Sequence, residues 1–486
     1  MARNRHLIQQ YQKEHALRLG AETQLKELQQ VQRPTASNSS LPPSANPPGA
    51  KPPVVKKPTG RRSGAQFGHA GKSRVLVPAE AVHHVVGHRP AVCRACQGLF
   101  DSDAPGEVKG RHQVFEIPPM AVLITEHQSL ACRCGLCGGV TRGMIPAEIA
   151  ASVTGARLTA MIGLLSASMK GSRRDVAQML SEVLGYPIAL GSVLAREAEL
   201  SAALAGSYQS LVEAAAASKV KYVDETGWKL RGKGRWLFVS ADQEQTIFRI
   251  DKNGTRPAFK ALLGIGNGCT NSDQEVLNGV FCSDRASIYD MLEIEQRQLC
   301  WAHLKRDFVA AIERGGAGEA AAAKMLLICR EMFELWHRFI DQEMGRKNLQ
   351  EAIQPLRSRM KEALAEGAAC GQKKTAGLCK ALLKREAALW RFASVPGLEP
   401  TNNLAERMLR PAVVWRKKSF GSNSQAGCRY VERMLSVIQT LRQRGHPVMN
   451  YLADAIQAHR KGQAPPAIPP RRDPDSAKAT ELRKVA

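Results

Sequence analysis

The sequence predicts an α/β fold in which a mixed β-sheet is accompanied by long helical stretches. Short β-type runs, in which side chains alternate with period two, follow one another in the middle of the chain at 220–224, 235–241 and 246–250. Stretches with helical patterning come before and after these runs, at 146–216, 315–392 and 393–460. At 486 residues the chain is too long for one ordinary core, so we expect roughly two to four domains.

The chain carries a large excess of positive charge. It has 69 Lys and Arg residues against 44 Asp and Glu, a formal net charge of +25 and a sequence pI of about 9.8. Such a field attracts polyanions, of which nucleic acid is the commonest, although a solvated basic surface is the alternative. No apolar run reaches the ~18 residues typical of a membrane-spanning helix, and the chain begins with polar residues. We therefore expect an intracellular protein without membrane contact.

The first two segments carry little that could form a core. Residues 1–32 read as a polar helix with a few apolar residues near one face, too few for a coiled coil. Residues 33–77 are rich in Pro, Ser and Gly, and no acid occurs between Leu28 and Ala79. This composition predicts an extended basic linker, which either lies along phosphates or serves only as a tether.

A cysteine-rich module follows at 78–145. Its two CxxC turns, in "CRAC" and "CRCGLC", predict a small zinc-ribbon-like module with structural Zn²⁺ bound by Cys93, Cys96, Cys134 and Cys137. The gap between the two turns is longer than in short zinc ribbons, and Cys132 or His88 could replace one ligand. Unmetallated buried thiols are the alternative. A closed four-thiolate site would fold the module and would do no chemistry itself.

The region 146–216 is predicted to be helical. The pattern predicts one helix at 173–184, a break at Gly185 and Pro187, and a second helix capped near Ser192. Two short helices around such a turn resemble a helix-turn-helix, whose second helix enters the DNA major groove. Any two packed helices give the same pattern, so both interpretations stay open.

Two acids stand at the ends of β-type runs. Val220, Tyr222 and Asp224 share one face of the first run. Asp284 ends a later run in the same way, on the face that also carries Cys282. A strand-end carboxylate on its own is usually a cap or a surface residue, but two on neighbouring strands can share a divalent cation.

A third acid would complete such a site, and Glu406 is the candidate. It lies in "NNLAERMLRPAVVWRKKSFGS", where Asn402 fits an N-cap and Pro411 ends the regular helical pattern. The alternative is an ion pair between Glu406 and Arg410 at i,i+4, a surface contact worth only ~0.3 to 0.5 kcal/mol.

Four long motifs occur in a fixed order: "VDETGW", "CSDRASIY", "CWAHLKRDF", and "NNLAERMLRPAVVWRKKSFGS" followed by "YVER". Together with the Ser/Pro stretch, the "GAQFGHAGKSR" segment and the cysteine-rich module, they closely resemble the transposases of the insertion-sequence-66 family. The resemblance covers nearly the whole chain, from about residue 20 to 460. It implies a transposase of the DDE type with a ribonuclease-H-like catalytic core.

The resemblance also assigns the catalytic acids. It selects Asp224, Asp284 and Glu406, and it rejects their neighbours Glu225 and Asp290. His303, in "CWAH", is either close to the catalytic metals or an ordinary helix-start residue.

The spacing of the acids implies an interrupted core. Asp284 and Glu406 are too far apart in sequence for a continuous ribonuclease-H-like core, and the Ala-rich stretch at 315–392 is therefore expected to be an inserted helical domain. The core then consists of 217–314 and 393–460, and the basic tail at 461–486 is expected to be disordered.

The implied chemistry explains why acids belong in a basic chain. Phosphodiester transfer uses two divalent ions roughly 3.5 to 4 Å apart, and carboxylate oxygens suit Mg²⁺ or Mn²⁺. Water would attack at the element end and release a 3′-hydroxyl, which would then attack target DNA. Basic residues around Glu406 predict contacts to DNA phosphates, with a solvated helix face as the alternative: Arg407, Arg410, Arg416, Lys417 and Lys418.

The expected partners are DNA at the element ends and at the target. Because two ends must be brought together, we expect a homo-oligomer on DNA, and accessory proteins of the same element are further candidate partners. The protein would be cytoplasmic and associated with the nucleoid when bound to DNA. Two other function classes stay open: a catalytically inactive DNA-binding protein derived from a transposase, and a nuclease on the same fold that cuts without joining.

Overall fold

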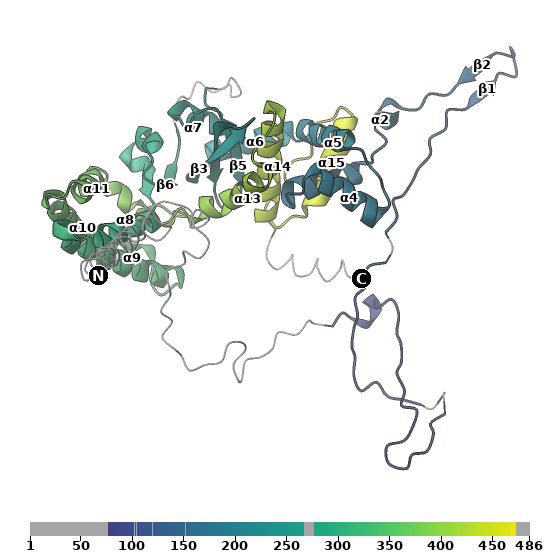
Figure 1. Ribbon diagram of the computed structural model, residues 1–486, viewed down its shortest axis with the longest axis horizontal. Coiled ribbons are helices and arrows are strands. Elements are labelled where there is room, and N and C mark those ends of the chain that lie inside the picture. The colour runs from purple at the N-terminus through teal and green to yellow at the C-terminus, as the bar shows by residue number, and fades with distance from the viewer. Residues whose placement is uncertain are drawn as a thin grey trace, which may run out of the picture.

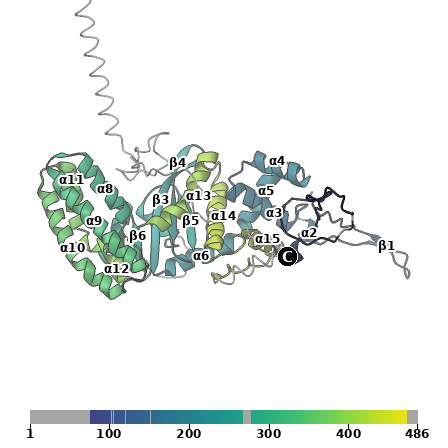
Figure 2. The ribbon, with the colours of Figure 1, turned by 90° about the horizontal axis from the view of Figure 1, so that it is seen from below.

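The computed structural model describes residues 76–472, apart from 102, 104, 119, 151 and 267–276. The predicted N-terminal helix at 1–32 and nearly all of the predicted basic linker lie outside the described residues. The described elements form an elongated molecule in which a helical region, a central sheet and a second helical region follow one another (Figure 1). The view turned by 90° shows the same order (Figure 2).

A five-stranded mixed sheet lies in the middle of the molecule. Its strands are β3 (Val220–Leu230), β4 (Lys233–Ala241), β5 (Thr246–Asp251), β6 (Val280–Ser283) and β7 (Arg297–Leu299). Their order across the sheet is β5-β4-β3-β6-β7. The first three are antiparallel neighbours, whereas β6 runs parallel to β3 and β7 runs parallel to β6. The predicted α/β class and the three-strand meander are confirmed, and β3 continues further than expected, to Leu230.

Helices cover both faces of the sheet. α13 (Asn403–Ser419) packs along β3 and β4. On the opposite face, Phe259 of α7 (Arg256–Leu262) meets Phe281 of β6 edge to face, with ring centroids 5.9 Å apart. Because side chains alternate along a strand, successive residues of β3 point to these two faces in turn. Neighbouring acids in β3 therefore face different surroundings.

The outer edge of the sheet is closed by side chains of α14 (Gln425–Gln443) rather than by another strand. The backbone N–H groups of β5 donate to Thr440 Oγ1, Ser436 Oγ and Glu432 Oε1, at distances of 3.1, 2.9 and 2.6 Å. Four residues of a helix advance by ~6 Å and two residues of a strand by ~6.6 Å, so every fourth residue of α14 meets every second residue of β5. An exposed strand edge is thereby covered.

The stretch predicted to be an inserted helical domain consists largely of helices (Figure 1). They are α9 (Glu319–Ile340), α10 (Arg346–Ala369), α11 (Lys373–Leu383) and the short α12 (Arg391–Ser394). α8 (Trp301–Glu313) leads into them from the sheet and packs on α9. The indole of Trp301 contacts that of Trp390 at 5.0 Å between centroids, and its Nε1 donates to the Leu389 carbonyl at 2.7 Å. The helices are thus anchored to the sheet through buried aromatic contacts.

On the other side of the sheet lie the helices of the predicted DNA-binding region. They are α3 (Ala156–Gly163), α4 (Arg173–Leu184), α5 (Leu190–Ala203) and α6 (Ala205–Ala217), with α15 (Val448–Arg460) packed on α3 and α5. α4 has the predicted bounds and begins with a capping box of Ser172 and Asp175. α5 begins at Leu190, slightly before the predicted cap at Ser192. Both predicted helices exist, but the exposed residues of α5 are mainly small or apolar, such as Leu190 and Leu194.

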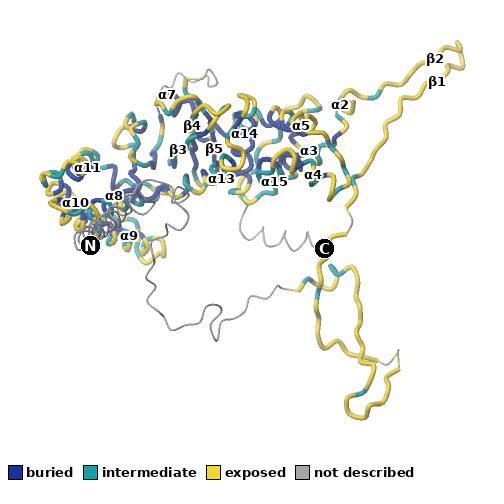
Figure 3. Tube along the Cα trace, viewed as in Figure 1, coloured by how far each residue is buried: buried dark blue, intermediate teal, exposed yellow. Residues whose placement is uncertain are grey.

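The cysteine-rich module projects from the rest of the molecule. β1 (Ala131–Arg133) and β2 (Val140–Arg142) form an antiparallel hairpin, followed by the short α2 (Ala147–Ala150), and a 3₁₀ turn at Ala79–Ala81 precedes them. Nearly all described residues of this module are exposed, whereas the sheet and the helices share a buried interior (Figure 3). In the described part of the chain, no helix is both long and apolar enough to cross a bilayer.

The described part of the predicted disordered tail packs on the helices. Tyr451 Oη donates to the Pro466 carbonyl at 2.8 Å, and Arg444 NH1 donates to the Pro469 carbonyl at 3.0 Å. The backbone N–H of Arg472 donates to the Arg444 carbonyl at 2.9 Å. Proline lacks an N–H but keeps its carbonyl, so a Pro-rich segment can still accept hydrogen bonds from a neighbouring helix.

Candidate functional site

Two of the predicted catalytic acids are brought together by strand register. β6 pairs in parallel with β3 through Tyr222 and Cys282, and the pairing stops there. Two residues further along, the same register would place Asp224 opposite Asp284. Asp284 Oδ1 accepts the backbone N–H of Ala286 at 2.8 Å, which ends the strand and fixes the carboxylate. The space beyond the end of β6 is therefore bordered by both acids.

The third predicted acid reaches this space from α13. Glu406 lies in the first turns of the helix, and its backbone N–H donates to the carbonyl of Asn402, the N-cap residue. Asn402 is buried and its Nδ2 donates to the Val223 carbonyl at 2.8 Å. The start of α13 is thereby held against the residue that precedes Asp224.

The segment before α13 is held to the same strand ends. Tyr222 Oη donates to the Gly397 carbonyl at 3.0 Å and accepts the Glu399 N–H at 2.7 Å. The backbone N–H of Trp301 donates to the Pro400 carbonyl at 3.0 Å. Residues on β3, at the start of α8 and before α13 therefore fix one another, although they are far apart in sequence.

The acids influence one another electrostatically. Burial raises the pKa of Asp224 well above its ordinary value, and the charges of Glu225, Asp284 and Glu406 raise it further. Burial and then the charge of Asp284 raise the pKa of Glu225 to about 7. Carboxylates this close repel one another without a cation, so a bound divalent ion would lower the cost of keeping them charged.

A second group of side chains adjoins Glu406. Ligand atoms of Cys300, His303 and Glu406 all lie within 4.8 Å of one another, with His303 Nδ1 3.7 Å from Glu406 Oε1. Arg306 NH2 lies 3.9 Å from the same oxygen. In the described residues this is the group that forms a tight cluster of possible metal ligands, and the three predicted acids are not drawn together so closely.

The chemistry of the donors distinguishes between these residues. Burial raises the pKa of Cys300 to about 11, so without a bound metal its thiol keeps its proton at neutral pH. Burial, followed by the charge of Arg306, lowers the pKa of His303, which favours a neutral imidazole. His303 Nδ1 and Glu406 Oε1 are both buried and have no hydrogen-bond partner. Buried polar atoms without a hydrogen-bond partner beside acids fit a bound cation. The carboxylate oxygens of Asp224, Asp284 and Glu406 are ligands of the kind that Mg²⁺ or Mn²⁺ prefers.

The two acids that the sequence interpretation rejected have other partners. Tyr289 Oη donates to Glu225 Oε2, on the sheet face that carries α7. Asp290 forms ion pairs with Arg297 at 2.6 Å and with Arg385 at 2.9 Å. The second pair joins the end of α11 to the turn at Ser287–Met291, close after Asp284. Asp290 thus connects the helices of 315–392 to the sheet.

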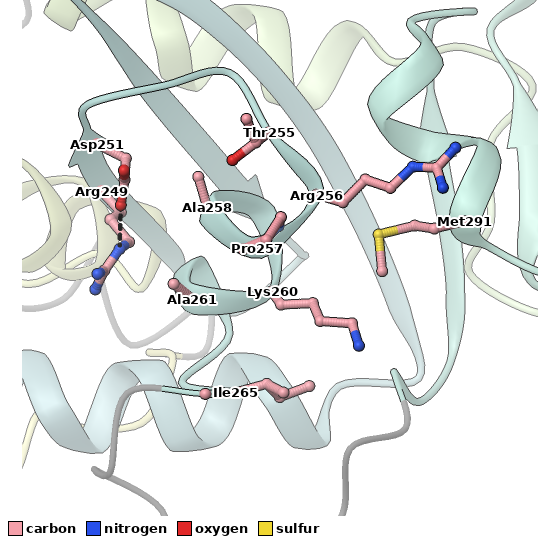
Figure 4. A pocket seen from close by; sticks show the side chains of 11 residues that line it. Arg249, Asp251, Thr255, Arg256, Pro257, Ala258, Lys260, Ala261, Ile265 and Met291 are labelled. Atoms are coloured by element: carbon pink, nitrogen blue, oxygen red, sulfur yellow. Dashed lines mark ion pairs between the residues drawn. The ribbon is translucent and has the colours of Figure 1, made fainter.

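A cavity of about 660 Å³ lies between the end of β5 and α7 (Figure 4). Arg256, Lys260 and Met291 line it, beside an Arg249–Asp251 ion pair at 3.6 Å. None of the three predicted catalytic acids lines this cavity. This cavity is therefore distinct from the candidate site, whose three acids are half-buried.

The predicted DNA-binding residues have different environments. Arg407, Arg410, Lys417 and Lys418 are exposed along α13. Arg416 is half-buried, and its NH1 donates to Thr226 Oγ1 at 2.9 Å and to the Gly227 carbonyl. Arg416 therefore holds α13 to β3. Sequence reasoning interpreted Asn402 as an N-cap, but its side chain makes no capping hydrogen bond and instead reaches Val223. Arg306 was not singled out, and the only local signal for it was its position one helical turn after His303.

The predicted zinc ligands form two separate turns. Cys93 accepts the backbone N–H of Gln97 at 2.9 Å through its carbonyl, and Cys134 accepts that of Gly138 in the same way. Backbone hydrogen bonds to the sulfur, first from Cys96 and from Cys137 respectively, lower the pKa of Cys93 and of Cys134. The described structure does not bring the four sulfurs into one cluster, and the two turns lie apart (Figure 1).

The comparison with known families agrees with this arrangement. The model of the family described as "Transposase IS66 family" matches residues 152–430, more than half of the chain. The chain belongs to the IS66 transposase family. The matched range contains β3, β6, α13 and the helices at 315–392, whereas the cysteine-rich module lies outside it. Membership in the IS66 family connects the chain with DNA transposition.

One curated relative is itself uncharacterized. The protein y4qI of Sinorhizobium fredii (strain NBRC 101917 / NGR234) is 27% identical over 242 residues, which cover 46% of this chain and 43% of that protein. The match therefore spans less than half of the length of this relative.

Proposed function

We propose that the chain is a DDE transposase that binds the ends of an insertion element, cleaves them and joins them to target DNA. One observation carries the proposal: the register of β3 and β6 brings Asp224 and Asp284 toward the same space, and Glu406 of α13 adds to the rise in the pKa of Asp224 that burial and the charges of Glu225 and Asp284 cause. Such a group of acids is expected where divalent ions hold a phosphodiester. IS66 family membership supports the same assignment.

The architecture supports a ribonuclease-H-like core. Three antiparallel strands are followed by two strands that run parallel to the first, and acids stand at or beyond the ends of strand pairing between the first and the fourth. The helices at 315–392 come between β7 and α13, where the resemblance implies an insertion. Their separate bundle leaves the strand order of the sheet intact.

Each residue then has a definite task. Bound Mg²⁺ or Mn²⁺ ions would activate the attacking oxygen and stabilise the leaving one. Asp224 and Asp284 would hold these ions, and Glu406 would complete the second position. The neutral ring of His303 and the charge of Arg306 lie beside Glu406, where they can contact the scissile phosphate. Asn402 and Arg416 are positioning residues, since they fix α13 on β3.

Two transfers follow one another at this site. Water attacks the phosphorus at the element end, the bond to the 3′ oxygen breaks, and that oxygen leaves as a 3′-hydroxyl opposite a 5′-phosphate. The 3′-hydroxyl then loses its proton and attacks a phosphodiester of the target. A new phosphorus–oxygen bond joins element to target, and a target 3′-hydroxyl leaves.

The remaining assignments support this function. The exposed basic side chains of α13 would hold DNA phosphates; they belong to Arg407, Arg410, Lys417 and Lys418. Binding of one Zn²⁺ by the four cysteines would require the two CxxC turns, which lie apart in the structure (Figure 1), to come together, and metal analysis of the purified chain tests for the ion directly. Two chains would act together on two element ends, with or without accessory proteins of the same element.

The decisive experiment is strand transfer by the purified chain on a labelled element-end duplex. We expect joined products with Mg²⁺ or Mn²⁺, no products in a chelator, and at least a thousandfold loss for Asp284→Ala, in line with the ~10³ or greater rate factors that metal catalysis supplies. Asp454→Ala, which removes an exposed acid from α15, is the matched control and should join normally.

The other outcomes distinguish the alternatives. Metal-dependent cutting without joining would favour a nuclease on the same fold. DNA binding without cutting, even after the products of neighbouring genes are added, would favour an inactive DNA-binding protein derived from a transposase.

A further inference from the structure

The end of α13 presents an unusual aromatic residue. Phe420 caps the helix in the left-handed conformation, with φ 57°, and its side chain is 78% exposed. This position normally takes Gly or Asn, because a bulky side chain is strained there. A hydrophobic contact with the last turn of the helix frequently accompanies a cap of this kind. Phe420 gains no such burial, so its conformation and its exposure both run against the stability of the fold.

The backbone around Phe420 is held rigidly. The Ser422 N–H donates to the Lys229 carbonyl at 2.8 Å, and the Arg231 N–H donates to the Ser422 carbonyl at 2.9 Å. Ser422 Oγ also accepts the indole N–H of Trp228 at 3.2 Å. Gly421, with φ 107°, is required here because a Cβ would overlap the Lys229 carbonyl. The turn is thus fixed to the β3–β4 hairpin, and Phe420 is presented to solvent rather than left on a loose loop.

The surroundings of Phe420 are basic. Lys417 and Lys418 end the helix that carries it, and the adjoining hairpin exposes Lys229 and Lys233. No acid occurs in the sequence between Glu225 and Asp242 or between Glu406 and Glu432. A solvated basic surface would not need a strained aromatic side chain at its centre. Basic side chains around an exposed aromatic ring are the combination by which proteins hold a nucleic-acid backbone and stack on its bases.

The position relative to the catalytic acids fits DNA that runs out of the site. Fourteen helical residues separate Glu406 from Phe420, which corresponds to ~21 Å along α13. Five strand residues separate Asp224 from Lys229, which corresponds to ~17 Å along β3. At ~3.4 Å per nucleotide step, these lengths amount to roughly five or six nucleotides.

We propose that Phe420 stacks on a DNA base about five or six nucleotides from the scissile phosphate, while Lys229, Lys233, Lys417 and Lys418 hold the adjoining backbone. The inference rests on the proposed function for its choice of DNA as the ligand. Stacking of this kind tolerates any base, since every base has a π-face. It would hold the strand in register with the acids.

The test compares variants of the full chain that distinguish three properties of Phe420: its aromatic ring, the apolar area of its side chain and the strain of its left-handed backbone. The probes are a mixed-sequence single strand and its duplex, each with a 2-aminopurine base, in a chelator so that no cleavage occurs. For Phe420→Gly we expect affinity for at least one probe to fall by roughly five- to a hundredfold, as for loss of one stacked base. Phe420→Trp should retain affinity, and the fluorescence of the introduced indole should be quenched on binding.

Stability provides an independent readout. Phe420→Gly should leave the thermal midpoint unchanged or raise it, because it removes the left-handed strain, so weaker binding is not explained by unfolding. Gln342→Gly is the matched control: Gln342 has φ 62° and is exposed at the end of α9, and its replacement should leave DNA affinity unchanged.

The salt dependence of DNA affinity distinguishes the contribution of the Phe420 ring from that of the lysines. Phe420→Gly should keep the slope of log affinity against log salt, whereas Lys229→Gln with Lys233→Gln should reduce it by about 0.7 to 0.9 per lost phosphate contact. Unchanged affinity of Phe420→Gly for both probes would overturn the proposal, and so would full affinity of Phe420→Leu, which keeps apolar area without a π-face. These measurements need no catalysis, so an absence of strand transfer would overturn the proposed function and leave this inference standing.

Discussion

At the scale of single residues, burial beside other acids makes the charged form of Asp224 unfavourable for stability, and a bound cation would relieve this cost. The parallel register of β3 and β6 ends two residues before Asp224 and Asp284, and Asn402 donates to the carbonyl of Val223, the residue immediately before Asp224. Burial and then the neighbouring charges raise the pKa of Asp224. An acid whose pKa is raised in the folded chain binds more protons there than in the unfolded chain, so stability falls as pH rises above its ordinary value of 3.8.

This gives Asp224→Asn opposite effects on stability and on metal binding. Without metal, we expect the variant to unfold at a higher denaturant concentration than the wild type, by a margin that is larger at pH 8 than at pH 5. Addition of Mn²⁺ should stabilise the wild type and have little effect on the variant, because a ligand stabilises only the state that binds it. Chemical denaturation with and without the ion is the measurement, with Asp454→Asn as an exposed control. A variant less stable than the wild type in chelator at pH 8 would contradict this view of the site.

At the scale of elements, the α14–β5 edge depends on a buried acid. Glu432 is fully buried, accepts the Ile250 N–H at 2.6 Å and forms an ion pair with Arg429 at 2.8 Å. Burial raises its pKa to about 7, although Arg429 acts in the opposite direction. The raised pKa means that the folded chain binds the proton of Glu432 more tightly than the unfolded chain does. The stability that this proton binding contributes is lost as pH rises from about 4.5 to 7.

Replacing Glu432 by Gln should therefore remove part of the pH dependence of folding. A shift of this size corresponds to about 3 kcal/mol at most between pH 4.5 and 7. The amide oxygen can still accept the Ile250 N–H, so Glu432→Gln should gain stability relative to the wild type as pH rises, by up to that amount. Urea unfolding at pH 5 and pH 8 measures it, and Glu362→Gln, an exposed change on α10, should show no such trend. A constant difference between wild type and variant at the two pH values would refute the prediction.

Local sequence patterns predicted the helices and strands better than they predicted the contacts between them. The strands, α4 and the position of Asp284 after β6 follow from side-chain alternation, helical patterning and apolar runs, all of which are contained within a few residues. Asp224, in contrast, lies within β3 rather than at its end. Closure of the sheet edge by α14 involves residues nearly 200 positions apart, and the Asn402–Val223 hydrogen bond spans 179 positions. No local pattern encodes such pairs, which is why Asn402 was predicted only as a cap and Arg416 only as a DNA contact.

At the scale of the whole molecule, the hydrophobic core explains which parts should fold together. Both clusters of buried apolar residues are built from residues 156 onward, and the larger one joins the sheet to helices on both of its sides. The exposed module at 78–145 contributes to neither cluster (Figure 3). The described end of the chain contributes hydrogen bonds to α14 and α15 from a segment whose composition predicted disorder.

These contacts predict the limits of the stable unit. A chain of residues 146–472 should unfold in one transition at nearly the midpoint of the full chain, because it keeps the whole core. A chain of residues 146–463 should be less stable by about 2 kcal/mol or more, since the partners of Tyr451, Arg444 and His446 at Pro466, Pro469 and Pro470 are lost and a net hydrogen bond is worth ~0.5 to 1.5 kcal/mol. Denaturant unfolding followed by circular dichroism measures both. Equal stability of the two fragments would mean that the docked segment adds nothing to the fold, and a large loss in 146–472 would mean that the cysteine-rich module supports the core through contacts with it.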